Sequence, residues 1–166
     1  MYFTIMVLKI WHAGGFFSCC SIKLDKIVEY YNQCKELPKS LNTDRLFKRY
    51  KPRRQKRCIT YDYFKHFDHY QINLDNLKGK LDYSHNYQYK DYSTLDYQNL
   101  SKVVRKYFSP SNEIEKIIKD IQDKYQLDYD NTCVLFYRGN DKNKETQICG
   151  YQEYLSYIDK VLQQNS

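Results

Sequence analysis

The apolar residues of this chain fall into short runs typical of strands and longer stretches with a helical period. The run over 2–11 predicts a buried first strand, and apolar positions recur at helical spacing over 21–31. A turn over 12–18 separates the two, and a short strand is expected over 37–41. A strand, a turn, a helix and a second strand are typical of the first unit of an α/β fold.

The second half of the chain alternates in the same way. Helical patterns over 100–108 and 111–126 are followed by a β-favouring run over 132–137, a polar loop, and another helical pattern over 151–161. Ser111 is expected to cap the second of these helices. The apolar face of that helix is made by four isoleucines, Ile114, Ile117, Ile118 and Ile121.

These patterns predict an α/β fold with a mostly parallel sheet flanked by helices. Within this fold, residues 131–166 supply a further strand, loop and helix after the units of residues 1–130. The strand over 132–137 is expected to join the first sheet or to pair with another chain, because a parallel strand needs neighbours.

Two loops carry candidate chemistry. The strand over 132–137 ends at Arg138, and Asp141 and Lys142 follow in the same loop. Ligands gather at the carboxyl ends of strands in open α/β sheets, so this arginine is placed to meet an anion. In the first turn, Gly14 and Gly15 permit close approach of the backbone to an anion at the helix start, although a simple turn needs glycine as well.

The net positive charge of the chain is concentrated in one segment. The formal net charge is +7, and seven basic residues without an acidic one lie over 48–57. The remaining 20 basic residues balance the 20 acidic ones. This basic loop is interpreted as a solvated loop; the alternatives are contact with nucleic-acid or membrane phosphates, or a nuclear-localisation signal.

Other candidate features are weaker. Six cysteines without a regular framework indicate reduced thiols and a cytoplasmic protein, and the first apolar run is too short to span a bilayer. The segment over 78–97 is rich in tyrosine and is either a stacking platform or a loop packed on the body. His66, Asp68 and His69 lack a second pair of ligands, so no metal site is expected.

The residues from Val134 to Lys142, with the helix before them, resemble the first motif of the fucosyltransferase-like glycosyltransferases. That superfamily includes the nodulation and core fucosyltransferases, the protein O-fucosyltransferases and relatives in large DNA viruses. Arg138 matches its arginine and Asp141 its acidic position, whereas Phe136 replaces its histidine and Gly139 a second arginine. The first turn resembles the family's glycine-rich turn, with Ser18 in place of its asparagine.

The resemblance implies that residues 1–130 form a Rossmann-like lobe similar to the N-terminal lobe of a GT-B enzyme. Residues 131–166 would then form the first strand, loop and helix of an incomplete nucleotide-sugar-binding lobe. The implied donor is a nucleotide sugar, GDP-fucose, used without a metal or other cofactor. Arg138 would stabilise the departing β-phosphate, because a guanidinium donates two hydrogen bonds and carries a permanent charge. Asp141 and Lys142 would contact the donor or hold the arginine. Backbone N–H groups at Gly14, Gly15 and Ser18 would donate to the diphosphate.

The chain ends soon after the arginine motif, whereas the family has a complete second lobe. The resemblance therefore implies either part of a longer enzyme that acts on an unknown glycan or protein acceptor, or a truncated remnant that binds without turnover. A viral relative would act in the host cytoplasm or the virion. The alternatives are a nucleic-acid-binding protein that uses 48–57, and a non-catalytic interaction protein that keeps the fold.

Overall fold

The structure is a computed structural model, and its description covers residues 5–7, 9–51, 60–65, 79–132, 134 and 147–164. The chain divides into two compact units, Met1–Ile121 and Gln122–Ser166. The boundary predicted from the sequence lies after residue 130. Each unit is described by itself.

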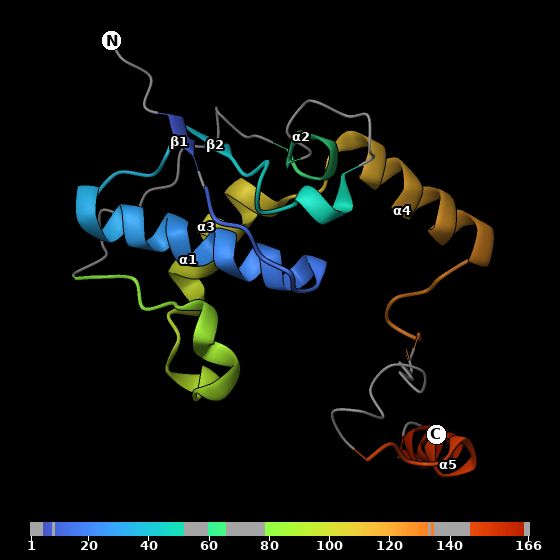
Figure 1. Cartoon of the computed structure of the whole chain (residues 1–166). Helices are drawn as coiled ribbons and strands as arrows, with labels where there is room; N and C mark the ends of the chain where they lie inside the picture. The colour runs from blue at the N-terminus through green and yellow to red at the C-terminus, as the bar shows by residue number, and fades with distance from the viewer. Residues whose placement is uncertain are drawn as a thin grey trace. The chain divides into compact units, whose positions relative to one another are not determined.

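The first unit begins with a strand, a turn, a helix and a second strand (Figure 1). Strand β1 (Ile5–Val7) pairs in parallel with β2 (Ser40–Asn42), with Met6 opposite Leu41. Helix α1 (Phe16–Cys34) connects them. The helix starts before Ser21, where the apolar period begins, so the glycine turn is shorter than the sequence indicated.

The prediction of a Rossmann-like, mostly parallel sheet is wrong. The described residues are 59% helix, and β1 and β2 are three residues each in a two-stranded sheet. Between β2 and residue 97, the described segments are polar or rich in tyrosine without an alternating pattern, and they satisfy backbone groups locally in helical turns. The elements that follow β2 are η1 (Lys48–Tyr50), α2 (Thr60–Tyr63), η2 (His85–Tyr89), η3 (Tyr92–Thr94), α3 (Tyr97–Phe108), α4 (Asn112–Tyr125) and α5 (Tyr151–Gln164).

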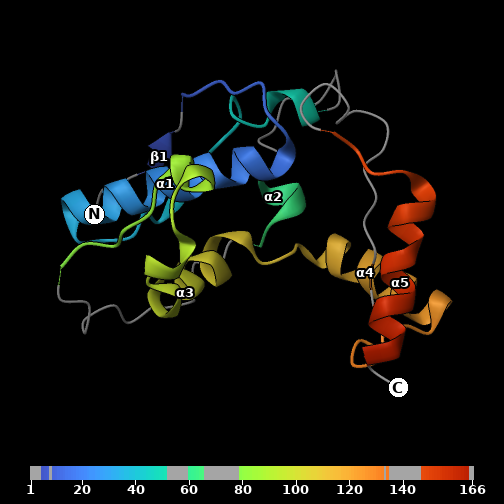
Figure 2. The same cartoon turned by 90° about the horizontal axis from the view of Figure 1, so that it is seen from below.

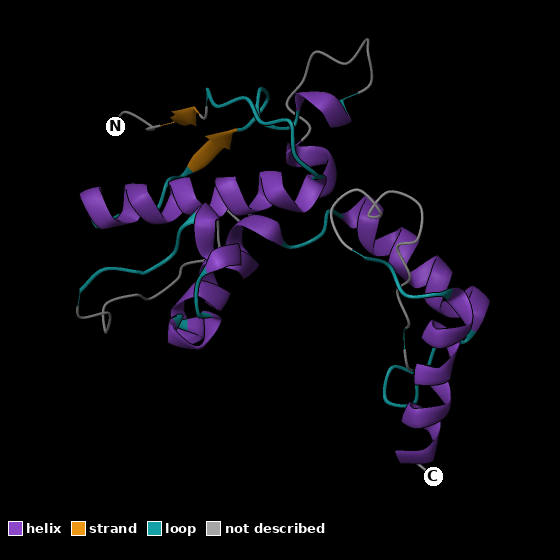
Figure 3. Ribbon diagram, turned by 60° about the horizontal axis from the view of Figure 1, so that its bottom comes forward, coloured by secondary structure: helices purple, strands orange, loops and turns teal. Residues whose placement is uncertain are grey.

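Helix α1 is the centre of the first unit. It lies between the strand pair and α3 (Figures 2 and 3). The expected apolar face of α1 is buried, and it packs with Leu41 of β2 and with Val103 and Tyr107 of α3. The Tyr107 hydroxyl donates to the Pro38 carbonyl at 2.6 Å, which gives this buried phenol the partner it needs.

A second, aromatic cluster surrounds the start of α1. The ring of Phe16 lies 5.3 Å from that of Phe47 and 5.1 Å from that of Tyr63, measured between centroids. Phe47 and the neighbouring Leu46 are buried, and the Cys19 thiol donates to the Leu46 carbonyl. This cluster fixes the N-terminal end of α1, where the glycine turn lies.

Lys23 of α1 is a fully buried cation. Its ammonium donates to the Tyr107 carbonyl at 2.7 Å and lies 4.4 Å and 4.3 Å from the ring centroids of Phe64 and Phe108. A desolvated ammonium is costly unless it is compensated, and here the compensation includes two ring faces and a carbonyl at the C-terminal end of α3.

Helix α4 follows the predicted pattern but leaves its apolar face in solvent. The Ser111 hydroxyl accepts from the Ile114 N–H at 3.4 Å, which confirms the expected cap. The side chains of Ile117, Ile118 and Ile121 are 52%, 43% and 46% exposed. The helical period therefore identified the residues that share one face of α4. Among the described residues, this face is not buried in a hydrophobic core.

In the second unit, α5 confirms the helix expected over 151–161. The predicted strand over 132–137 is described only at Thr132 and Val134, neither of which is in a strand. Residues 133 and 135–146 lie outside the described residues. Within the part of the chain that the structure describes, no helix is long and apolar enough to cross a bilayer.

Replacing Lys23 should lower the stability of the protein much more than replacing Lys26, a lysine at the surface. We expect Lys23→Ala to lower the free energy of unfolding by about 3 kcal/mol, because it removes the ammonium contacts and leaves a cavity. Lys26→Ala, which removes an exposed pair with Glu29, should cost about 0.5 kcal/mol. Urea denaturation followed by circular dichroism measures both, and equal losses would contradict the structural role of Lys23.

Candidate functional site

At the start of α1, the first backbone N–H groups have no acceptor among the described residues. Gly15 is the N-cap, with φ −64° and ψ 166°, and no side chain caps this end. The first helical hydrogen bond runs from the Cys19 N–H to the Gly15 carbonyl at 3.0 Å. The N–H groups of Phe16, Phe17 and Ser18 therefore have no acceptor within the helix. With no acidic residue in the first turn, the positive end of the helix dipole is not neutralised there.

The glycine turn is held by η1. The Arg49 guanidinium donates to the Ala13 carbonyl, and the Tyr50 hydroxyl donates to the Gly14 carbonyl at 3.1 Å. These contacts add a permanent positive charge beside a turn that already carries free N–H donors. An anion is the ligand that such a combination favours.

Two residues of the turn form a close pair. His12 Nε2 lies 2.7 Å from Ser18 Oγ, within hydrogen-bond distance, and both side chains are half-buried. A Cβ added at Gly14 would lie 2.2 Å from His12 Nε2. A residue without a side chain is therefore required at position 14 for the imidazole to reach Ser18.

One polar stripe of α1 is paired with residues 79–87, which run along it in the opposite direction. Asn32 donates to the Leu81 carbonyl at 2.8 Å and accepts from the Leu81 N–H at 2.9 Å. Nearer the start of the helix, the hydroxyls of Ser21 and Tyr83 are 2.7 Å apart. The segment thus progresses from the C-terminal to the N-terminal part of α1.

This path brings His85 to the glycine turn. The ring centroids of His85 and His12 are 5.5 Å apart, edge to face. His85 Nδ1 is buried, and within the described residues it has no hydrogen-bond partner. A buried ring nitrogen without a partner is uncommon, because it loses its hydration without compensation.

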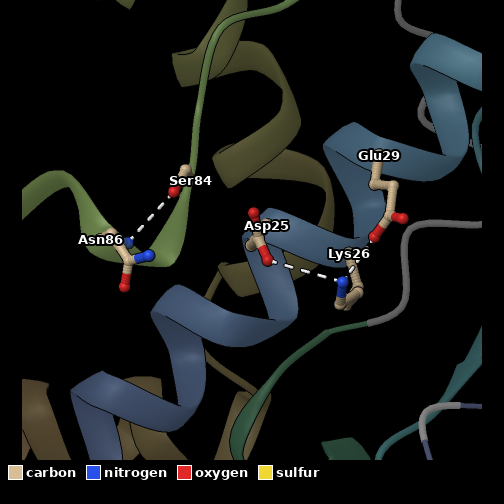
Figure 4. Close-up of polar contacts among 5 residues, drawn as sticks. All are labelled: Asp25, Lys26, Glu29, Ser84 and Asn86. Atoms are coloured by element: carbon tan, nitrogen blue, oxygen red, sulfur yellow. Dashed lines mark hydrogen bonds and ion pairs between the residues drawn. The ribbon is translucent and has the colours of Figure 1, made fainter.

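A groove of about 430 Å³ lies farther along the same stripe. The Lys26 ammonium is 3.8 Å from the Asp25 carboxylate and 2.5 Å from that of Glu29, while the Ser84 hydroxyl accepts from the Asn86 N–H (Figure 4). Lys26 and Lys80 together offset the charges of the Asp25 and Glu29 carboxylates, so the groove offers an anion less than the turn does. Its lining residues are Asp25, Lys26, Val28, Glu29, Asn32, Gln33, Lys80 and Tyr83.

The sequence identified part of this arrangement. Gly14, Gly15 and Ser18 come together at the start of α1, as expected. Arg138, Asp141 and Lys142 lie outside the described residues, so their proximity to the turn stays a prediction. His66, Asp68 and His69 lie outside them as well. The described parts of the chain contain no group of three or more His, Cys, Asp or Glu placed to hold a metal ion.

The basic loop is described only over 48–51. Lys51 is paired with Asp44 and Arg49 with the Ala13 carbonyl, so these two cations have intramolecular contacts. Residues 52–57 lie outside the described residues. In the tyrosine-rich segment, Tyr87 is buried and stacks on Tyr83, as the packed interpretation expects. Tyr92 and Tyr97 are exposed.

Sequence reasoning missed His12, His85 and Arg49. His12 stands immediately before the glycines and could have been noticed as one of only four histidines in the chain. His85 and Arg49 reach the turn through tertiary contacts between segments without a regular period, which a single sequence does not reveal.

Comparison of the chain with protein-family models, with curated proteins and with solved structures finds no match. The resemblance to fucosyltransferase-like enzymes therefore rests on the quoted motifs alone.

Gly14→Ala should break the pair between His12 and Ser18. The new methyl group would occupy the position of the imidazole, so the ring must turn away. Imidazole ¹⁵N and ¹H shifts of His12 should change to those of a ring without the Ser18 contact. Gly15→Ala is the control, because no atom lies within 4 Å of its Cβ position. Identical spectra for wild type and Gly14→Ala would contradict the contact.

The cysteines of α1 should differ in reactivity. Burial raises the pKa of the Cys20 thiol to about 11, so at pH 8 roughly one molecule in a thousand carries the reactive thiolate. Cys34 is exposed. Iodoacetamide at pH 8, followed by peptide mass spectrometry, should modify Cys34 well before Cys20, and the Cys20 rate should still rise with pH above 10. Equal rates at pH 8 would contradict this burial.

Proposed function

We propose that the chain binds the diphosphate of a nucleoside-diphosphate sugar at the glycine turn and the start of α1. The observation that carries the proposal is the N-terminus of this 19-residue helix, which has no side-chain cap and no acidic residue in its first turn. Its first three N–H groups have no acceptor within the described parts of the chain. Arg49 adds a fixed positive charge at the same turn.

Two large exposed side chains flank the turn and suit the rest of such a ligand. Trp11 is 63% and Phe17 84% exposed. An exposed aromatic face is a surface on which a nucleobase stacks, and base–aromatic stacking contributes about 1–3 kcal/mol per base. The turn thus combines donors for a diphosphate with apolar surfaces for a base.

The reaction class follows from the motif resemblance. We propose a fucosyltransferase-like glycosyltransferase, or a truncated remnant that binds the donor without turnover, with GDP-fucose as the donor and an unknown acceptor. Arg138 is proposed to stabilise the departing β-phosphate, with Asp141 and Lys142 beside it. We place the protein in the cytoplasm, and a viral relative in the host cytoplasm or the virion.

Titration calorimetry with GDP tests the proposal through Gly15→Asp. Aspartate is a good N-cap residue, so this variant should fold at least as well as the wild type. Its carboxylate would occupy the N–H groups and repel the diphosphate. We expect wild-type protein to bind GDP and Gly15→Asp to bind at least about tenfold more weakly, a change of about 1.4 kcal/mol.

The matched control is Gly150→Asp. Gly150 precedes α5, its carbonyl accepts from the Tyr154 N–H at 2.9 Å, and its Cβ position is equally open. This variant should bind GDP like the wild type, whereas Arg138→Ala should bind it more weakly. No GDP binding by the wild type, or equal binding by Gly15→Asp, would overturn the proposal.

A further inference from the structure

The pair of Ser18 and His12 has the geometry of a nucleophile and its base. An alcohol becomes an effective nucleophile when an imidazole nitrogen within about 2.6–3.2 Å accepts its proton. The observed separation of Ser18 Oγ from His12 Nε2 is 2.7 Å. Both side chains are half-buried, so the pair is shielded from bulk water and still accessible to a ligand.

The surroundings fix this geometry from three sides. Gly14 leaves room for the imidazole, because a Cβ there would overlap His12 Nε2. Tyr50 and Arg49 hold the carbonyls of the turn. The ring of His85 contacts that of His12, and its buried Nδ1 has no partner among the described residues. A water or a polar group of a ligand can satisfy a buried nitrogen of this kind.

The start of α1 supplies what a nucleophile of this type also needs. Acyl transfer develops negative charge on the carbonyl oxygen, and backbone N–H groups stabilise that charge. The Ser18 hydroxyl belongs to the same helical turn as the N–H groups of Phe16, Phe17 and Ser18, for which the residues that the structure describes offer no acceptor. The exposed rings of Phe17 and Trp11 offer a surface to an apolar acyl or alcohol group.

We propose that Ser18 is a nucleophile activated by His12, and that the turn is an acyl-transfer site for esters with an apolar portion. This activity goes beyond nucleotide-sugar binding, in which Ser18 only donates a hydrogen bond. His12 accepts the proton at Nε2, which requires the tautomer protonated at Nδ1.

Ser18 Oγ bonds to the ester carbonyl carbon as its proton passes to His12 Nε2, and the carbonyl electron pair moves to oxygen near the helix N–H groups. The carbon–oxygen bond to the alcohol then breaks, and His12 returns the proton to the leaving oxygen. Water attacks the acyl-serine by the same route, which releases the acid and restores Ser18.

A fluorophosphonate carrying an alkyl chain and a fluorophore is the probe. Attack by Ser18 forms a phosphorus–oxygen bond, fluoride leaves, and the serine proton passes to His12. We expect one labelled site in the full chain, mapped to Ser18 by peptide mass spectrometry. Ser18→Ala should abolish labelling, and His12→Gln should slow it by on the order of 100-fold, the usual contribution of a general base.

Ser101→Ala is the matched control. Ser101 lies on α3, and its exposed hydroxyl also makes a hydrogen bond, to the Gln98 carbonyl, so its replacement should leave the labelling rate unchanged. His12→Gln retains Ser18 and keeps the proposal testable if Ser18→Ala fails to fold. Labelling no faster than that of heat-denatured protein, labelling mapped to another residue, or an unchanged rate in His12→Gln would overturn the proposal.

Discussion

The pairing between the polar stripe of α1 and residues 79–87 is the constraint on which the site depends. A helix that buries one face between a strand pair and α3 still has to satisfy the polar atoms on its other face. Asn32 bonds to the backbone of Leu81, and Ser21 bonds to the Tyr83 hydroxyl. These two contacts hold residues 79–87 along the helix. His85 reaches the glycine turn as a result, because the chain that carries it is held at two earlier points.

The elements that the sequence predicted well depend on local rules. The apolar period of α1, the Ser111 cap of α4 and the extent of α3 follow from residues within one or two turns of each other. The predicted sheet depended on strands finding neighbours far along the chain, and such pairing is not written in any one segment. For the same reason, the period of α4 identified its isoleucine face but not its exposure.

For the candidate site as well, the sequence predicted the local features but not the contacts between distant segments. Two glycines before a helical period indicate backbone donors for an anion, which identified Gly14 and Gly15, and the family resemblance added Ser18. The contacts of the turn with Arg49, Tyr50 and His85 could not, because these residues stand in segments without a regular period. The contact of His12 with Ser18 depends on the absence of a side chain at Gly14, which leaves space for the imidazole ring, and this spatial requirement is not visible in the sequence.

The buried ammonium of Lys23 also has a consequence for the order of folding during synthesis. Its carbonyl acceptor, at Tyr107, lies 84 residues farther along the chain. Until that residue has left the ribosome, a nascent α1 carries a cation on the face that must become buried, and water competes for it. The helix can form early, but its packing waits for α3, so the first unit should fold after most of it has been made rather than element by element.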